Sequence, residues 1–318
     1  MNIKRLVIEN FKSIERIELI EPNPFTVFVG PNGSGKSNIF EALEFSQLRL
    51  TIDSTRALVS LFGGFSNIQP RKNPQREFSF LLEDDSLRAS ISLDETGGSH
   101  GREIFADKSS WEQLNNFTRL FIGNERLVKL KYTDNEGLTT SASNMEAVLK
   151  RLLSDKILNE EIHEWLDLFV PGFKKVEVVS DTFDSKDTLL VYEAGVDKPF
   201  TKDLISDGTY SILALLTAVY QSDEPQFLCI EEPENGLHPQ VQMTLVEFFR
   251  KICQEKGHYI WLNTHSEAIV RKLTTDEIVL VDKVNGLTKI KQTKGRNIYD
   301  LPTDEAWLTG MLGGGLPW

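Results

Sequence analysis

The sequence contains the run Gly30-Pro31-Asn32-Gly33-Ser34-Gly35-Lys36-Ser37, which has the spacing G-x-x-x-x-G-K-S. A β-branched and aromatic stretch, residues 25–29, precedes this run, and an apolar periodic stretch, residues 37–43, follows it. The first stretch predicts a buried strand and the second a helix, so the glycine-rich run is expected to connect them. Backbone N–H groups in such a loop, together with the positive end of the helix, bind phosphate groups. The pattern therefore predicts a nucleoside triphosphate ligand.

Two side chains at the end of the run have predicted roles of their own. Lys36 would reach the β- and γ-phosphates, and the Ser37 hydroxyl would ligate Mg²⁺, so ATP and Mg²⁺ are the expected cofactors. The alternative is a glycine-rich turn that binds nothing, and the match of every fixed position in the right context disfavours it. The predicted nucleotide-binding residues of this segment are Gly30, Pro31, Asn32, Gly33, Ser34, Gly35, Lys36, Ser37 and Asn38.

Composition sets limits on the class of protein. A chain of 318 residues with 40% hydrophobic content can bury a real core. Its apolar runs are shorter than the roughly 20 residues of a membrane span, and the N-terminus lacks the pattern of a secretion signal, so we expect a cytoplasmic protein without membrane contact. Cys229 and Cys253 lack C-x-x-C spacing and are expected to be buried, which makes a zinc site improbable. The net charge of −12 argues against unaided DNA binding.

The pattern along the chain predicts an α/β fold. Residues 3–9 and 14–20 are expected to form a hairpin, and from residue 200 strands and helices alternate, which predicts a mainly parallel sheet covered by helices. We predict one composite domain, 1–318, in which residues 1–50 and 200–318 form the nucleotide-binding core and residues 51–199 an inserted β-rich and helical lobe. Within this lobe, an antiparallel β subdomain is expected from residues 77–83, 87–93 and 118–122, and helices from 144–153 and 157–169.

A second segment carries paired acids. Residues 226–230 read as an apolar strand that leads into Glu231 and Glu232, the form of a Walker B segment. Because neighbouring residues on a strand point in opposite directions, the two carboxylates are expected to do different work. We predict that Glu231 binds Mg²⁺, directly or through water, and that Glu232 is the general base that orients the attacking water. Solvated acids at a strand end are the alternative, which the complete phosphate loop disfavours.

Two further residues are candidates through their position. His265 follows the predicted strand 259–262, so it would lie at the same sheet edge as the acids and contact the γ-phosphate. A lone histidine at a strand end is more often structural. Ser206 precedes a helix, and with the N–H groups around Gly208 it forms a cradle for an anion. Taken locally, Ser206 is simply a helix cap, and the local pattern favours that interpretation.

Five short motifs together resemble a known family. They are Ile8-Glu9-Asn10-Phe11-Lys12-Ser13-Ile14, the Gly30 to Ser37 run, Ser206-Asp207-Gly208-Thr209, the segment from Ile230 to Pro239, and Thr264-His265-Ser266. In this order the sequence resembles the ABC-type ATPase heads of SMC, RecF and OLD proteins, and most closely the stand-alone bacterial AAA family ATPases that share this head. The resemblance implies an ABC-ATPase head with mixed and parallel sheets, an antiparallel β subdomain and an inserted helical segment.

The resemblance also implies an assembly. Two heads would form a head-to-tail homodimer in which Ser206 of one chain caps the γ-phosphate bound by the other. Lys12 would approach the phosphates, and a glutamine after the first helix would sense Mg²⁺. Gln69 is our candidate, although a surface glutamine is the simpler interpretation. Glu231 stands where many relatives have aspartate.

The leading functional hypothesis is an ATP-driven switch that controls a partner effector, a nuclease or toxin, in bacterial antiphage defence. Because the sequence ends at Trp318 without a TOPRIM segment, we expect any nuclease action to come from another polypeptide. The alternative is a DNA repair or recombination ATPase of RecF type. A transporter subunit fits the Asn10 to Ile14 and Ser206 to Thr209 motifs poorly. A non-hydrolysing scaffold is distinguished from an ATPase by measuring the ATP turnover of Glu232→Gln. The best basic cluster for DNA is Lys283, Lys289, Lys291, Lys294 and Arg296, although Lys289 and Lys291 alternate on an expected strand, for which a solvated face is the simpler interpretation. The tail 306–318 is expected to dock on the body, and docking on a partner is the alternative.

Overall fold

The structure is a computed structural model that describes residues 1–74, 76–94, 98–124, 135–180 and 187–316. The chain divides into two compact units, each described by itself. Unit 1 comprises Met1–Arg119, Glu224–Glu232 and Val246–Trp318, and unit 2 comprises Leu120–Asp223 and Pro233–Leu245. The division predicted from sequence has other boundaries, and the roles of its two parts stay a prediction.

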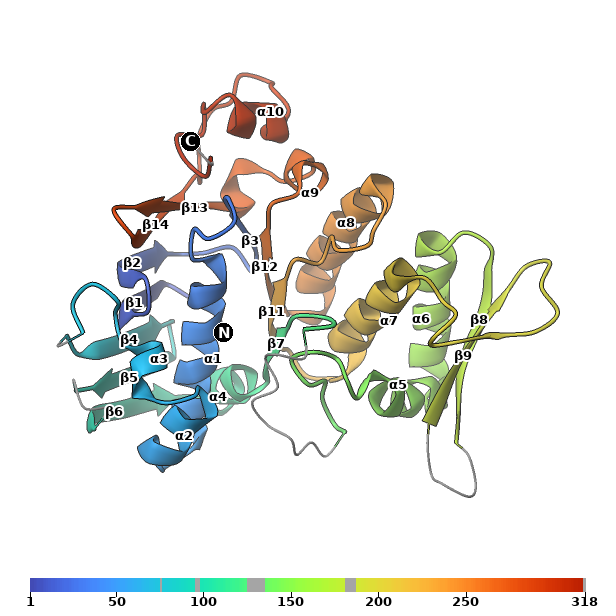
Figure 1. Ribbon diagram of the computed structural model, residues 1–318, viewed down its shortest axis with the longest axis horizontal. Helices are drawn as coiled ribbons and strands as arrows, with labels where there is room; N and C mark the ends of the chain where they lie inside the picture. Colours follow the sequence, from blue (N-terminus) through green and yellow to red (C-terminus); the bar gives the residue numbers. More distant parts are fainter. Residues whose placement is uncertain (75, 95–97, 125–134, 181–186, 317–318) are drawn as a thin grey trace. The chain divides into compact units, whose positions relative to one another are not determined.

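The centre of unit 1 is a mixed sheet of eleven strands (Figure 1). In order across the sheet, the strands are β6 (Ser99–Ala106), β5 (Leu87–Leu93), β4 (Phe78–Glu83), β1 (Arg5–Phe11), β2 (Ile14–Ile20), β14 (Leu287–Gln292), β13 (Ile278–Val284), β3 (Phe25–Val29), β12 (Tyr259–Thr264), β11 (Phe227–Glu231) and β7 (Phe117–Leu120). β3 pairs in parallel with β12 and β13, and β12 in parallel with β11. The predicted α/β class and the parallel sheet after residue 200 are confirmed.

Burial separates the two kinds of strand in this sheet. Every residue of β3, β11 and β12 is buried, as expected for parallel strands covered on both faces. In β4 and β5, buried residues alternate with more accessible ones, the pattern of antiparallel strands with one face on a core. The continuous apolar runs in the sequence therefore mark the strands that carry the candidate site residues at their ends.

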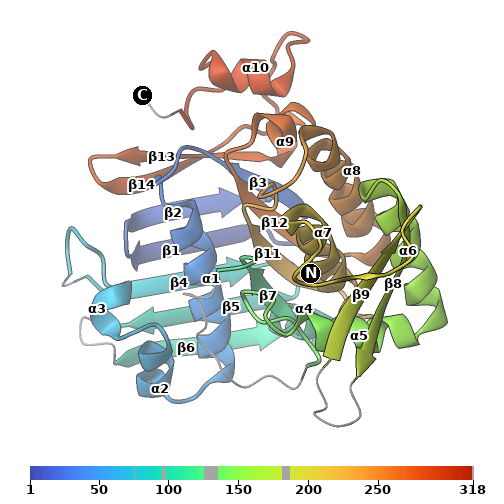
Figure 2. The same cartoon turned by 45° about the vertical axis from the view of Figure 1, so that its right-hand side comes forward.

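The helices of unit 1 are α1 (Lys36–Thr51), α2 (Thr55–Leu61), α3 (Phe65–Ile68), α4 (Lys108–Asn115), α9 (Glu267–Arg271) and α10 (Thr303–Leu308), with a 3₁₀ turn at Thr275–Glu277. Figure 2 shows α1 against the antiparallel part of the sheet. The Phe45 ring of α1 lies 5.9 Å from Phe11 of β1 and 5.3 Å from Phe78 of β4, measured between ring centroids. This aromatic packing fixes α1, whose first two residues are Lys36 and Ser37.

Unit 2 contains a separate antiparallel sheet with the strand order β10-β9-β8. Its elements are α5 (Met145–Ser154), α6 (Lys156–Phe169), β8 (Phe173–Ser180), β9 (Asp187–Glu193), β10 (Phe200–Thr201) and α7 (Asp207–Tyr220), while α8 (Pro239–Lys256) contributes residues to both units. The helices predicted at 144–153 and 157–169 are confirmed.

One predicted grouping of strands is wrong. Residues 118–122 were expected to join residues 77–93 in an antiparallel subdomain, but β7 lies at the opposite edge of the large sheet, beside β11. β6 takes the expected place next to β5. The β-forming residues of a strand indicate that it is a strand, but not which neighbour it will have. The difference matters because β7 brings Arg119 next to the strand that ends in Glu231.

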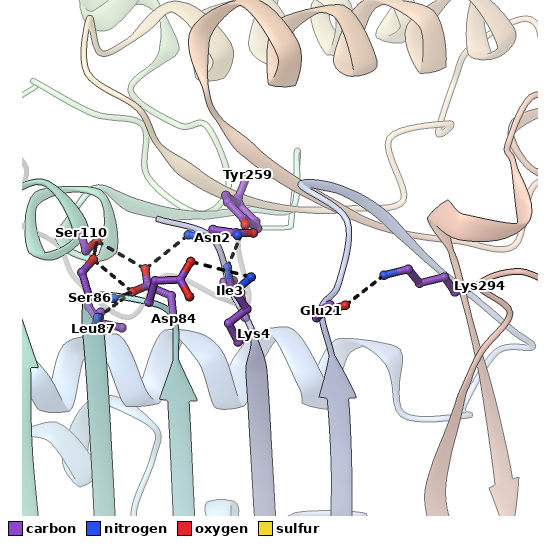
Figure 3. A network of polar contacts seen from close by, with 11 residues as sticks. Asn2, Ile3, Lys4, Glu21, Asp84, Ser86, Leu87, Ser110, Tyr259 and Lys294 are labelled. Carbon is purple, nitrogen blue, oxygen red and sulfur yellow. Dashed lines mark hydrogen bonds and ion pairs between the residues drawn. The ribbon is translucent and has the colours of Figure 1, made fainter.

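The first residues of the chain and the described part of the tail, residues 306–316, both contact the body of unit 1. Figure 3 shows the N-terminal contacts, in which the Ile3 N–H donates to Tyr259 Oη at 3.0 Å and the Asn2 N–H to Asp84 Oδ2 at 3.3 Å. A surface pocket lined in part by Lys4, Pro24 and Lys294 lies there. Pro24 directly precedes β3, whereas the glycine-rich loop follows it, so this pocket is at the wrong end of β3 for a phosphate ligand.

The C-terminal tail docks on unit 1, as expected. Trp307 Nε1 donates to the Gly315 carbonyl at 3.0 Å, and the Gly315 N–H donates to Asp282 Oδ1 at 2.6 Å. Leu312 is completely buried. These contacts make the tail part of the folded body rather than a separate extension.

Candidate functional site

The glycine-rich loop connects β3 to α1, and two distant hairpins brace it. Gly35 has φ 104°, and a Cβ at this position would lie 2.0 Å from Thr288 Oγ1, so only glycine fits. Thr288, in β14, donates its hydroxyl to the Ser34 carbonyl at 2.9 Å, and its oxygen lies 2.6 Å from Ser13 Oγ. Sequence reasoning missed this brace, since nothing in a lone strand threonine marks it.

The polar side chains at the start of α1 donate hydrogen bonds to the glycine-rich loop, to the end of β11 and to the turn between β1 and β2. Lys36 is 6% exposed, and its ammonium donates to the carbonyls of Gly30 at 2.6 Å and Pro31 at 3.1 Å. Ser37 is exposed, and its hydroxyl donates to Glu231 Oε2 at 2.5 Å. Asn38 Nδ2 donates to Ser13 Oγ at 2.7 Å. The loop thus has an organised set of donors around an accessible serine hydroxyl.

The two acids at the end of β11 have different environments. Glu231 is 2% exposed and lies opposite Asn263 of β12 in the parallel register. Asn263 Nδ2 donates to Glu231 Oε2 at 3.3 Å, and Asn263 Oδ1 accepts from the Glu232 N–H at 3.1 Å. Glu232 has φ 47°, in the left-handed region, and its side chain is 29% exposed. A buried acid and an accessible acid on one strand end are consistent with two different roles, which stay predictions.

His265 lies at the same sheet edge, directly after β12. Its Nδ1 is 4.0 Å from Glu232 Oε1, and its side chain is 44% exposed. The parallel pairing of β3, β12 and β11 explains the proximity, because the carboxyl ends of parallel strands meet at one edge. Ser37, Glu231, Glu232 and His265 are therefore brought together from three separate segments.

A buried arginine, Arg119, contacts Glu231 at this sheet edge, and sequence reasoning missed it. Arg119 Nε donates to Glu231 Oε1 at 2.6 Å, and Arg119 Nη1 donates to Glu44 Oε2 at 2.8 Å. Burial alone would lower the pKa of Arg119, but the charges of Glu231 and Glu44 outweigh it and raise the pKa above its ordinary value. The signal available in the sequence was a lone charged residue in the apolar stretch 117–122.

Lys12 and Gln69 lie on neighbouring loops of unit 1. Lys12 Nζ is 2.5 Å from Glu41 Oε2, so its ammonium contacts the second turn of α1. The Lys12 N–H donates to the Ile68 carbonyl at 3.0 Å, which places Gln69 beside the same loop. The Gln69 amide donates to the Pro74 carbonyl at 3.5 Å. The assignments of Lys12 to phosphate and Gln69 to metal remain predictions.

Ser206 caps α7 within unit 2. Its hydroxyl accepts from the Thr209 N–H at 3.1 Å, which confirms the predicted cap, and the residue is exposed. A Cβ at Gly208 would lie 2.7 Å from the Gly236 carbonyl, so glycine allows the turn after β11 to approach the first turn of α7. This is a structural reason for Gly208; the role of Ser206 and Gly208 toward a nucleotide in a second chain remains a prediction.

The donor atoms at the edge fit Mg²⁺. The hydroxyl of Ser37 and the carboxylate of Glu231 converge, and Mg²⁺ in nucleotide sites usually takes one or two such ligands plus phosphate and water oxygens. Among the residues that the structure describes, no group of three or more His, Cys, Asp and Glu side chains could hold a metal ion.

The basic cluster proposed for DNA is largely engaged within the chain. Lys289 pairs with Glu15 at 3.7 Å and Lys294 with Glu21 at 3.5 Å. Lys291 and Arg296 donate to carbonyls of the C-terminal tail at 3.2 and 3.0 Å. Four members of the cluster therefore have partners within the chain.

Comparison with solved structures shows the fold of an SMC head. An SMC head bound to the C-winged helix domain of ScpA matches with a TM-score of 0.61 and 15% identity, over 92% of this chain and 98% of that one. The SMC head domain from Thermotoga maritima matches with a TM-score of 0.52 and 17% identity, over 92% and 99%. At such identities the likeness establishes the architecture alone.

Sequence relatives point to the same group. The chromosome partition protein Smc of Methanocaldococcus jannaschii is 47% identical over 45 residues, 14% of this chain and 4% of that protein. The structural maintenance of chromosomes protein 4 of Saccharomyces cerevisiae is 28% identical over 142 residues, 43% and 10%. The DNA replication and repair protein RecF of Citrifermentans bemidjiense is 27% identical over 96 residues, 29% and 26%. The matches thus cover only 4% to 26% of these relatives' lengths.

The fold, the sequence relatives and a family model together identify an ABC-type ATPase of the SMC and RecF group, a class that binds nucleotide, typically with Mg²⁺, and hydrolyses ATP. Within this class, residues 25–271 match the model of the AAA_21 family, described as "AAA domain, putative AbiEii toxin, Type IV TA system". Because the match covers most of the chain, the protein belongs to this family. Among the described residues, none of the helices combines the length and apolar character of a membrane span.

Proposed function

We propose that the protein is a molecular switch in which ATP closes two copies of the chain head to tail and hydrolysis reopens them. The observation that carries this proposal is the meeting of Ser37, Glu231, Glu232 and His265 at one sheet edge, beside a braced phosphate loop. Ser206 of the second copy would contact the γ-phosphate. Its exposed position at a helix N-terminus supports this role.

Catalysis in such a site is mostly positioning and charge neutralisation. The loop N–H groups and Lys36 would bind the phosphates, and Lys36 would exchange its loop carbonyl partners for phosphate oxygens. Ser37 and Glu231 would hold Mg²⁺, which neutralises phosphate charge when bound. Glu232, accessible and 4.0 Å from His265, would accept the proton of the attacking water, while His265 would contact the γ-phosphate.

The first test is the variant Glu232→Gln. It keeps the shape of the side chain but cannot accept a proton, so steady-state ATP turnover should fall about 100-fold or more while nucleotide binding persists. Glu267→Gln is the matched control, because Glu267 is an exposed acid in the first turn of α9, near the same edge. Its turnover should stay within about twofold of wild type. Equal turnover of wild type and Glu232→Gln would remove Glu232 from the mechanism and leave a scaffold as the better description.

We further propose that the switch controls a partner effector, a nuclease or toxin, in bacterial antiphage defence. The support is the family description, which names a toxin of a toxin–antitoxin system. Cells that carry the native operon should plate phage less efficiently than cells that carry the same operon with Glu232→Gln. Equal plating in both strains and in cells without the operon would contradict the defence role without touching the ATPase.

A DNA repair or recombination ATPase is the second candidate, favoured by the match to RecF. The net charge of −12 and the internal contacts of Lys289, Lys291 and Lys294 weigh against it. Duplex binding by the purified chain that weakens steeply with salt would support this candidate. No binding at low salt, with and without ATP, would exclude it for the chain alone.

A further inference from the structure

The guanidinium of Arg119 lies buried between the strand end that carries Glu231 and the helix that carries Ser37. Arg119 is on β7, the sheet neighbour of β11, and its side chain is 2% exposed. Its Nε and Nη2 both contact Glu231 Oε1, and its Nη1 donates to Glu44 Oε2 of α1 at 2.8 Å. One side chain therefore joins the acid of β11 to α1.

The two oxygens of Glu231 have different partners. Oε1 accepts from the Arg119 guanidinium, whereas Oε2 accepts from the Ser37 hydroxyl at 2.5 Å and from Asn263 Nδ2 at 3.3 Å. The final torsion of a glutamate is soft, so packing alone would not fix the plane of the carboxylate. A rigid guanidinium that hydrogen-bonds to Oε1 fixes the plane of the carboxylate, and therefore also the direction of Oε2.

Charge supports the same assignment. Glu44 and Glu231 are both buried, and Arg119 is the cation that contacts both of them. Glu41, one turn away on α1, pairs with Lys12 instead. Two buried carboxylates without a cation would be costly to keep ionised. A lysine ammonium could supply the charge, but it lacks two separate nitrogen donors that can both hydrogen-bond to one carboxylate oxygen.

We propose that Arg119 is a positioning residue for the Mg²⁺ of the nucleotide site: it holds Glu231 so that Oε2 faces Ser37. The inference rests on the proposed function, since it concerns the metal that accompanies the nucleotide. In this role Arg119 itself would touch neither substrate nor metal, since its guanidinium contacts Glu231 and Glu44. It acts through the orientation and charge of Glu231.

The test compares Arg119→Met with Glu44→Gln. Binding of a fluorescent mant-ATP is measured for each purified variant with Mg²⁺ and with EDTA, next to thermal unfolding. In Arg119→Met, affinity in EDTA should stay within about twofold of wild type, while the gain in affinity on adding Mg²⁺ should shrink about tenfold or more. Glu44→Gln also disturbs the buried cluster but leaves the contact between Arg119 and Glu231, so its Mg²⁺ gain should equal that of wild type.

Arg119→Lys keeps the positive charge but lacks the planar guanidinium with its several N–H donors. This variant keeps the inference testable if Arg119→Met does not fold. It should lose part of the Mg²⁺ gain, less than Arg119→Met does. The inference would be overturned if Arg119→Lys, and Arg119→Met where it folds, gained as much mant-ATP affinity from Mg²⁺ as wild type and differed only by a lower melting temperature. That result would leave the proposed function standing. Wild type without Mg²⁺-dependent binding would overturn the proposed function and this inference with it.

Discussion

The phosphate-loop edge of unit 1 and the Ser206 segment of unit 2 differ in how their side chains are engaged. At the loop edge, side chains from distant segments hold one another: Thr288 contacts Ser34, and Glu231 contacts Ser37 and Arg119. The Ser206 side chain contacts Thr209, in its own helix, and is exposed. One region is arranged in advance inside a single unit, whereas the other presents its polar groups outward. We therefore expect nucleotide binding to belong to the single chain and rapid turnover to the assembly.

Of the variants that test this comparison, Ser206→Asp has the largest expected effect. Aspartate caps a helix as well as serine does, so the fold should be kept, but its charge would repel the γ-phosphate held by a second chain. ATP turnover should fall about 100-fold, while mant-ATP binding at protein concentrations that favour monomers stays unchanged.

Ser54→Asp is the matched control for this variant. Ser54 also caps a helix, accepting from the Ala57 N–H at 3.2 Å, and is exposed. Its turnover should equal that of wild type. If Ser206→Asp were as active as this control, the segment would be a helix cap and nothing more.

A smaller effect is expected from Thr288→Val, which removes the brace under the loop without changing the side-chain shape. Loss of about 1 kcal/mol of hydrogen bonding at the loop should weaken mant-ATP binding by up to about fivefold. Thr293→Val is matched to it: Thr293 is equally buried, and it donates to the Thr275 carbonyl at 2.6 Å, away from the loop. Both variants should unfold at lower temperature, but equal loss of affinity would show that the brace is not specific to the loop.

The sequence predicted those parts of the site that are contiguous. The Gly30 to Ser37 loop, the acids at 231 and 232 and the histidine after the strand at 259–264 each lie within one segment with its own pattern. Their meeting at one edge followed from the expected parallel sheet. The same holds for the Ser206 cap, which depends on its own helix alone.

The contacts that depend on sheet order were not predictable. Arg119 reaches Glu231 because β7 lies beside β11, and its own residues do not specify that neighbour. Thr288 contacts the loop because β14 pairs with β2, and the residues of this strand do not specify that neighbour. Gln69 was chosen by resemblance in chain order, and its role toward a metal is still a prediction.

The measurement that tests the composite site most directly mixes two inactive chains. Lys36→Ala should not bind nucleotide productively, and Ser206→Asp should not complete the site of its partner. In an equal mixture, about half of the dimers contain one chain of each kind, and each of these has one intact site, so about a quarter of wild-type turnover should return. If the mixture stays as inactive as either variant alone, although both variants fold and associate, the two chains do not share a site in this way.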